Sequence, residues 1–173
     1  SSMSRLLEDV LTFGKSEDGK LSYNPTDLYV NNVIRDIINE VQNIDQSRHE
    51  FIFEPEAQTV FYTDHYLLRQ VLINIMINAT KFSPIGSPVV IDIHNNNQEI
   101  LIDIIDKGTG ISDEDRKHIF EPFFRNEKNI GIVPGTGLGL AIVKRCISML
   151  KGEIIINSKL GGGTKVTIKL PKI

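Results

Sequence analysis

Three glycines at alternate positions open an apolar helical run near the end of the chain. Residues 135–140 read Gly-Thr-Gly-Leu-Gly-Leu and lead into Ala-Ile-Val-Lys-Arg-Cys-Ile. A glycine-rich turn lets backbone N–H groups approach a ligand closely, and a helix start adds unpaired N–H donors and the positive end of its dipole. The segment therefore predicts either an anion site, most often for phosphate, or a glycine-rich hinge.

A polar stripe on an otherwise apolar helix is the second feature that could do chemistry. Asn74, Asn78 and Lys81 fall within a narrow arc at 3.6 residues per turn, with isoleucine, valine and leucine on both sides. Buried amide and ammonium groups are costly unless paired, so the stripe faces either a polar cavity or backbone that satisfies the asparagines. An asparagine carbonyl is a hard oxygen ligand suited to Mg²⁺ beside phosphate.

Asp106 ends an expected strand and is followed by Gly108 and Gly110. An ionised carboxylate only accepts hydrogen bonds, whereas the adenine amino group donates them and guanine presents an acceptor at that position. An Asp-Gly turn between a strand and a helix would use the same residues. The segment therefore predicts either an adenine-selecting carboxylate or a structural turn.

The elements that must position these residues follow from the spacing of apolar side chains. Helical spacing predicts helices over residues 2–13, 30–41, 66–81 and 138–150, with a short capped helix beginning at Ser112. Shorter apolar runs predict strands over residues 51–53, 59–62, 89–93, 100–106, 154–157 and 165–170. This order predicts an α+β fold, a two-layer α/β sandwich with mostly antiparallel strands.

Bulk properties exclude several classes of protein. A chain of 173 residues suits one domain, and a net charge of −3 gives no reason to expect nucleic acid. No apolar run approaches the roughly 18 residues of a membrane span. The lone Cys146 cannot form an internal disulfide, and no Cys/His cluster has metal-site spacing. Because the chain starts abruptly in a helical pattern, we expect a fragment of a larger receptor.

Five segments in order carry a family resemblance: residues 69–84, 106–111, 119–125, 135–140 and 161–164. Together they resemble the catalytic, ATP-binding domain of the sensor histidine kinases of two-component systems. That ATP fold is shared with DNA gyrase, MutL and the large heat-shock chaperone ATPases. The resemblance implies a mixed, mostly antiparallel sheet covered on one face by helices.

The resemblance also implies ATP and Mg²⁺ as cofactors and a role for each site residue. Asn78 would bind Mg²⁺ together with the ATP phosphates, Lys81 would lie near the phosphates, and Asp106 would contact the adenine amino group. Thr164 would support the base, and Phe82 stands where family members often have Tyr, so a hydroxyl contact is lost. The implied nucleotide-binding residues are Asn74, Asn78, Lys81, Phe82, Asp106, Gly108, Gly110, Ile111, Gly135, Thr136, Gly137, Leu138, Gly139, Leu140 and Thr164.

Residues 125–136 are polar and contain glycine without periodicity, so they form either a plain surface loop or a lid over the phosphates. Arg125 at its start either steadies the γ-phosphate, as a catalytic residue beside Asn78 and Lys81, or is solvated. Asn74 stands where ATPases of this fold place a Glu that activates water. A neutral amide cannot act as a general base, so Asn74 favours phosphate transfer over hydrolysis.

His49-Glu50-Phe51 superficially matches the start of the acceptor motif of this enzyme class, but Phe51 and Phe53 alternate as in a strand. We therefore expect the acceptor histidine to lie outside this chain. Residues 1–14 are expected to be the C-terminal end of a dimerisation and phosphoacceptor helix. Residues 15–24 are expected to be a linker, and residues 25–173 the catalytic ATP-binding domain.

The expected function is transfer of the ATP γ-phosphate to a histidine on a dimerisation domain, for relay to a response regulator aspartate. The expected partners are that phosphoacceptor domain and the response regulator, with no nucleic acid and no direct membrane contact. The expected location is the cytoplasm, in a parent that is soluble or membrane-anchored. Two alternatives remain: a nucleotide-binding interaction module without transfer, and an ATPase clamp of the same fold.

Overall fold

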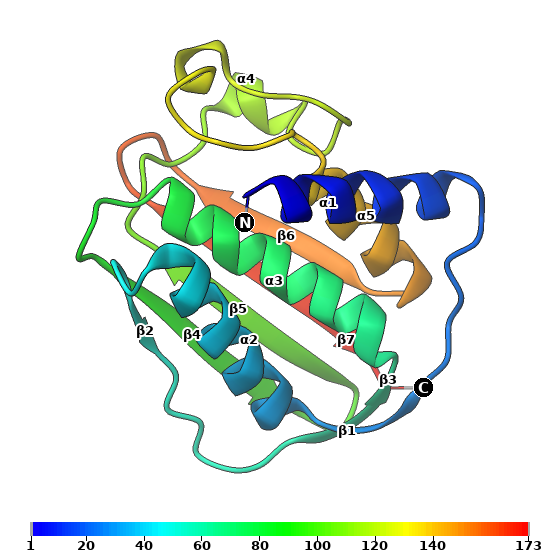
Figure 1. Ribbon diagram of the computed structural model, residues 1–173. Helices are drawn as coiled ribbons and strands as arrows, with labels where there is room; N and C mark the ends of the chain where they lie inside the picture. Colours follow the sequence, from blue (N-terminus) through cyan, green and yellow to red (C-terminus); the bar gives the residue numbers. More distant parts are fainter. Residues whose placement is uncertain (1, 173) are drawn as a thin grey trace.

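The computed structural model describes residues 2–172 and folds them into two layers, helices against a mixed sheet (Figure 1). The sheet order is β2-β4-β5-β7-β6, in which β2 and β4 are parallel and every other pair is antiparallel. The strands are β2 (Glu50–Ile52), β4 (Pro88–Asn95), β5 (Glu99–Asp106), β6 (Glu153–Ser158) and β7 (Thr164–Pro171). The predicted fold class is confirmed.

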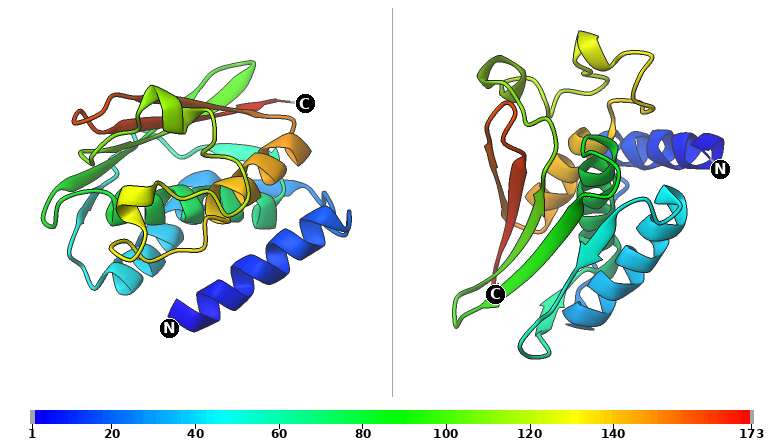
Figure 2. Two further views of the ribbon diagram at one scale, coloured as in Figure 1. Left: turned by 90° about the horizontal axis from the view of Figure 1, so that it is seen from above. Right: turned by 90° about the vertical axis from the view of Figure 1, so that its left-hand side faces the viewer.

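Three helices cover one face of this sheet: α2 (Val30–Asp45), α3 (His65–Lys81) and α5 (Gly139–Met149) (Figure 2). The central helix α3 packs against both α2 and α5 as well as against β4 and β5. Its N-cap is Asp64, whose carboxylate accepts a hydrogen bond from the backbone N–H of Leu67 at 2.8 Å. Because α3 is apolar on most sides, it is buried over nearly its whole length and carries its polar stripe into the interior.

Alternation along β5 and β7 decides which face of the sheet is covered. Ile102 and Ile168 are fully buried against the helices. On the opposite face, Asp103 lies 3.3 Å from the Lys165 ammonium and accepts a hydrogen bond from the Thr167 hydroxyl at 2.6 Å. The alternation of apolar and polar residues along β7 thus gives this strand one buried and one wet face.

A second, two-stranded sheet is formed by β1 (Thr26–Tyr29) and β3 (Val60–Thr63), which pair antiparallel. The sequence did not predict β1, because four residues with mostly exposed side chains show no usable periodicity. Its conformation comes from pairing with β3, more than thirty residues further along the chain. This small sheet lies at the end of the molecule where α3 begins (Figure 1).

The first helix, α1 (Ser2–Glu17), lies against α5 and continues past its predicted end at residue 13. The backbone N–H groups of Asp18 and Lys20 bond to the carbonyls of Gly14 and Lys15, and Gly19 takes a positive φ of 67° just after the last turn. Residues 15–17 of the predicted linker are therefore helical, because these local bonds extend the helix.

Two short elements complete the fold: α4 (Asp113–Arg116) and the 3₁₀ turn η1 (Glu127–Asn129). The predicted cap of α4 is confirmed, since the Ser112 hydroxyl accepts a hydrogen bond from the Asp115 N–H at 3.1 Å. η1 lies inside the segment predicted as a lid or loop. Within the described part of the chain, no helix combines the length and the apolar character that crossing a membrane requires.

Candidate active site

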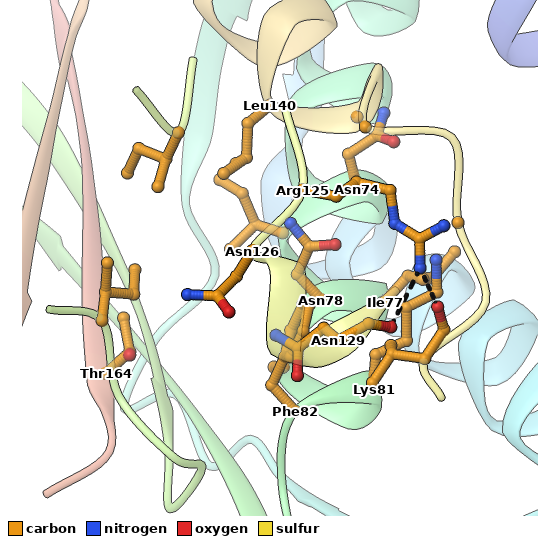
Figure 3. A pocket seen from close by; sticks show the side chains of 18 of the residues that line it. Asn74, Ile77, Asn78, Lys81, Phe82, Arg125, Asn126, Asn129, Leu140 and Thr164 are labelled. Carbon is orange, nitrogen blue, oxygen red and sulfur yellow. Dashed lines mark hydrogen bonds between the residues drawn. The ribbon is translucent and has the colours of Figure 1, made fainter. Parts of the chain in front are cut away.

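A cavity of about 370 Å³ lies between the C-terminal half of α3, the adjoining ends of β5 and β7, and the segment that leads into α5. This volume is within the range of small-molecule sites. Figure 3 shows Asn74, Asn78 and Lys81 facing it from α3, and Thr164 across it on the sheet. The predicted site residues that line it are Asn74, Asn78, Lys81, Phe82, Asp106, Gly110, Ile111, Arg125, Gly135, Thr136, Gly137, Gly139, Leu140 and Thr164.

Two predicted site residues, Gly108 and Leu138, do not line the cavity. A Cβ on Gly108 would stand 2.6 Å from the carbonyl oxygen of Phe82, so only glycine allows this approach of the two backbones. The Leu138 side chain is 1% exposed and lies in the core, while its N–H bonds to the Thr136 hydroxyl at 3.1 Å. Both residues support the site from behind.

The Asp106 carboxylate stands at the sheet end of the cavity. One of its oxygens accepts a hydrogen bond from the Gly108 N–H at 2.7 Å. Burial raises the pKa of Asp106 above the usual Asp value, and the Gly108 hydrogen bond acts in the opposite direction. The arrangement places a desolvated acceptor in the cavity wall, with a local bond that fixes its orientation.

Ser158, at the end of β6, supports this end of the cavity and was missed in the sequence. Its buried hydroxyl accepts from the Ile111 N–H at 2.8 Å, donates to the Gly163 carbonyl at 3.0 Å and lies 2.7 Å from the Thr164 hydroxyl. It thereby joins three separate segments. A lone serine at a strand end carries no sequence signal for such a role.

Gly110 shows why this end of the site requires glycine. Its φ is +73°, and a Cβ there would stand 2.0 Å from the carbonyl oxygen of Lys159. The loop after β5 is therefore pressed against the turn between β6 and β7. An Asp-Gly turn is present, as one interpretation held, and the same turn carries the carboxylate into the cavity.

The two asparagines of α3 are in different situations. Asn74 is 4% exposed, and its amide donates to the Gln70 carbonyl at 2.7 Å while its oxygen accepts from the Arg5 guanidinium at 3.4 Å. Within residues 2–172 the half-buried Asn78 amide has no such partner and faces the cavity (Figure 3). Asn74 is thus satisfied by protein, as one interpretation held, whereas the Asn78 amide is open toward the cavity.

The side chains that line the cavity could bind a metal ion only together with a bound anion. Among the described residues, no group of three or more His, Cys, Asp or Glu side chains could hold a metal ion. Mg²⁺ keeps several waters and commonly takes its remaining ligands from substrate phosphates. The neutral Asn78 carbonyl therefore fits Mg²⁺ that arrives with phosphate oxygens.

The start of α5 lines the cavity beside Asn74, at the end away from Asp106. Leu138 at the N-cap contributes no side-chain hydrogen bond, and Gly139 and Leu140 of the first turn line the cavity. Gly137 has a φ of +76°, and a Cβ there would stand 2.6 Å from the carbonyl carbon of Phe123. The glycines thus permit a close turn that presents the first N–H groups of a helix to an anion.

Lys81 connects α3 to this glycine-rich turn. Its ammonium would stand 3.2 Å from a Cβ on Gly135. Burial lowers the pKa of Lys81, as do the charges of Arg5 and Arg125, while Asp9 acts in the opposite direction. Lys81 thus places a partly desolvated ammonium beside the turn that leads into α5.

Arg125 braces the segment between residues 125 and 136. Its guanidinium donates to the carbonyls of Asn129, at 3.3 Å, and of Val133 (dashed lines in Figure 3). It therefore holds the loop's own backbone while lining the cavity, so it is not simply solvated. Asn126 and Asn129 also line the cavity, and the sequence did not single them out.

His49 is buried and remote from solvent. Its Nδ1 lies 3.0 Å from the Asp45 carboxylate, and its Nε2 donates to the Ser83 carbonyl at 3.2 Å. These contacts join the end of α2 to the segment after α3. A histidine so enclosed is a structural residue, in agreement with the expectation that it is not a phosphoacceptor.

The family model described as "Histidine kinase-, DNA gyrase B-, and HSP90-like ATPase" matches residues 63–173. The chain belongs to this ATPase family, and its resemblance to histidine kinases is confirmed by individual relatives. It is 33% identical over 178 residues to the autoinducer 2 sensor kinase/phosphatase LuxQ of Vibrio harveyi, covering 96% of this chain and 20% of that protein. It is 29% identical over 172 residues to the adaptive-response sensory kinase SasA of Crocosphaera subtropica, covering 98% and 45%. The chain thus spans less than half the length of these relatives.

Solved structures agree with this assignment. The mycobacterial sensor histidine kinase MprB superposes with a TM-score of 0.72 at 29% identity, covering 87% of this chain and 97% of that one. The Acinetobacter baumannii histidine kinase AdeS gives a TM-score of 0.77 at 29% identity, covering 97% and 77%. Fold and site together define an ATP-binding catalytic domain of the histidine kinase type.

Proposed function

We propose that this chain transfers the γ-phosphate of Mg-ATP to a histidine on a dimerisation domain, from which a response regulator aspartate receives it. The observation that carries the proposal is the pairing of two chemistries in one cavity. The buried acceptor of Asp106 lies at one end, and Asn78, Lys81 and the start of α5 converge on the other. ATP matches this arrangement, because its adenine carries a hydrogen-bond donor at one end and its phosphates carry negative charge at the other.

In the proposed reaction a neutral imidazole nitrogen attacks the γ-phosphorus, and the bond to the β–γ bridging oxygen breaks, leaving ADP. Phosphoryl transfer depends mostly on positioning and charge neutralisation. Asn78 would hold Mg²⁺, which neutralises charge on the phosphate oxygens. Lys81 and the first N–H groups of α5 orient the phosphates, and Asp106 fixes the base.

The structure favours transfer over hydrolysis at one position. Asn74 has its amide committed to Gln70 and Arg5, and a neutral amide cannot accept a proton from water. If this chain were an ATPase clamp, it would lack the general base expected at this position.

The second alternative is a nucleotide-binding module without transfer. Adding a separate acceptor domain distinguishes it from a kinase, because only a kinase would phosphorylate that domain. Such a catalytic domain would act in the cytoplasm, where ATP is available.

The test is to mix this chain with Mg-ATP and a separately produced acceptor domain from its parent gene. Acid-labile, base-stable phosphate should appear on the acceptor. The Asn78→Ala variant should lose the label, and Asn95→Ala, an exposed amide change at the end of β4, should keep it. Nucleotide binding without label on any acceptor histidine would instead support the interaction module.

A further inference from the structure

Helix α1 docks on the catalytic domain with its polar face inward. The residues on the inner side recur every three to four positions: Arg5, Asp9, Thr12, Phe13 and Ser16. The apolar stripe points outward, with Met3, Leu6, Leu7, Val10 and Leu11 all exposed. A helix that docked only to bury apolar surface would have the opposite orientation, so the inner polar residues need a reason of their own.

Two side-chain contacts, together with the burial of Ser16, fix the position of α1. The buried Thr12 hydroxyl lies 3.3 Å from the Tyr66 hydroxyl on α3. The Phe13 ring meets the Phe123 ring edge-on with centroids 6.2 Å apart. Ser16 is buried one turn further on. With this register fixed, the two charged residues of the inner face, Arg5 and Asp9, become part of the cavity wall.

Arg5 lies at the phosphate end of the cavity, away from Asp106. Its guanidinium donates to the Asn74 oxygen at 3.4 Å, a long hydrogen bond. That same oxygen is 3.1 Å from where a Cβ on Gly139 would be. The guanidinium is thus one side chain away from the start of α5. Figure 3 shows Thr164 on one side of the cavity and Asn74 with Lys81 on the other.

The charges around Lys81 do not balance. Two further cations, Arg5 and Arg125, act on Lys81, and one carboxylate, Asp9, opposes them. Among residues 2–172 no carboxylate lies within ion-pair distance of Arg5, although the charge of Arg5 acts on Asp9 one turn along α1. Like charges gathered in a partly desolvated site repel one another unless an anion joins them. A polyphosphate would supply that anion.

We propose that Arg5 of α1 is a nucleotide-binding residue that contacts the terminal phosphate of ATP, so that ATP occupancy and the docking of α1 favour each other. The identity of the ligand rests on the proposed function. A guanidinium can grip phosphate oxygens with two N–H groups, a stronger bond than the long one to Asn74. ADP lacks the terminal phosphate and leaves Arg5 on Asn74. Coupling of this kind is reciprocal by thermodynamic necessity.

Calorimetry on the full chain tests the contact, with a non-hydrolysable Mg-ATP analogue and with Mg-ADP. Arg5→Ala should lower the affinity for the analogue about tenfold and the affinity for ADP less than twofold. Arg5→Lys should restore part of the lost affinity for the analogue. Lys15→Ala is the matched control, because it removes the same charge from an exposed position on the same helix and should change neither affinity.

Hydrogen exchange tests the coupling. The triphosphate analogue should slow exchange in residues 5–16 of the unaltered chain and of Lys15→Ala, and should not do so in Arg5→Ala. If Arg5→Ala lost affinity equally for both nucleotides, or lost none, Arg5 would be only an anchor of α1. That result would overturn the inference while the proposed function stands. Failure of the unaltered chain to bind either nucleotide would overturn both.

Discussion

At the scale of single residues, Asn74 and Asn78 show how one residue type on one helix face takes two roles. Asn74 lies a turn deeper, where the Gln70 carbonyl and Arg5 occupy both ends of its amide. Asn78 lies one turn further toward the helix end, where the cavity opens beside it. Burial and neighbours, rather than helical phase, therefore distinguish Asn78 as the residue that we propose meets the ligand.

The first prediction concerns adenine selection. Asp106→Asn should weaken both ADP and ATP binding about tenfold, because the charge-assisted acceptor for the adenine amine is replaced by an amide. Discrimination against GTP should fall as well. Calorimetry would measure both, with the exposed Asp92→Asn as control. Equal affinity of the unaltered chain for ATP and GTP would contradict adenine selection.

A second prediction follows from the raised pKa of Asp106. Because the folded state holds this proton more tightly than the unfolded chain, ionised Asp106 costs stability, and the cost grows as pH rises from the usual Asp pKa of 3.8 through the raised value. A donor from the adenine amine favours the ionised form. Bound Mg-ADP should therefore lower the pKa of Asp106, as followed by the carboxyl carbon signal in NMR titrations. An unchanged midpoint would mean that the bound nucleotide brings no donor to this carboxylate.

The third prediction concerns His49. His49→Ala should lower the free energy of unfolding by about 2 kcal/mol, because it leaves the buried Asp45 carboxylate without its imidazole partner. Urea denaturation would measure this, with His94→Ala as control, since that side chain is 64% exposed. Phosphate transfer to an added acceptor should persist in His49→Ala. Radiolabel on His49 itself would refute the structural role.

At the scale of elements, the segment from residue 125 to residue 136 holds itself together without a strand or long helix. It contains η1, and the Asn126 side chain caps this turn by accepting from the Lys128 N–H at 2.9 Å. Arg125 ties its two halves through the carbonyls of Asn129 and Val133. The segment is also tied to α4, because the Asn126 amide donates to the Asp115 carboxylate, so any closure over a ligand would pivot near this bond.

The fourth prediction is that a triphosphate orders this segment. Hydrogen exchange in residues 125–136 should slow with a non-hydrolysable Mg-ATP analogue and less with ADP, because the analogue brings the terminal phosphate that the lid would contact. Exchange that is already slow without nucleotide, or that the analogue does not change, would make the segment a fixed loop.

At the scale of the whole molecule, the described residues form a cavity whose size and lining suit a nucleotide. The buried His49 is not accessible as a phosphate acceptor. The central helix α3 supplies the polar stripe, the sheet supplies the end with Asp106 and Thr164, and α1 contributes Arg5 and Asp9 to the cavity wall. In the proposed reaction, the acceptor imidazole would therefore come from a second protein surface.

The fifth prediction is that the isolated chain with Mg-ATP hydrolyses it very slowly and does not label itself. The physical reason is that the neutral amide of Asn74 cannot activate water and that the acceptor histidine is expected to lie outside this chain. Phosphate release and autoradiography would measure the two quantities over hours. Fast release would require a general base that Asn74 cannot provide and would favour the ATPase clamp.

The sequence by itself determined features that depend on neighbours along the chain. The helical spacing of apolar residues determined that α3 is a helix with a polar stripe. The alternation of apolar and polar residues determined which face of β7 is buried. Glycines marked backbone conformations such as those of Gly110 and Gly137, which their positive φ angles confirm. These are local consequences of sterics and burial, so most of the cavity wall could be predicted before the fold was known.

Only the tertiary structure decided which distant segments meet. Ser158 joins three segments, Arg125 bonds its own loop, and α1 turns its polar face inward to place Arg5 beside Asn74. In the sequence that helix reads as an ordinary amphipathic helix of another domain, because periodicity gives the two faces of a helix but not the surface that each will meet. Which face docks depends on the hydroxyl and aromatic partners that other elements bring to it, and these are set by the packing of the whole chain.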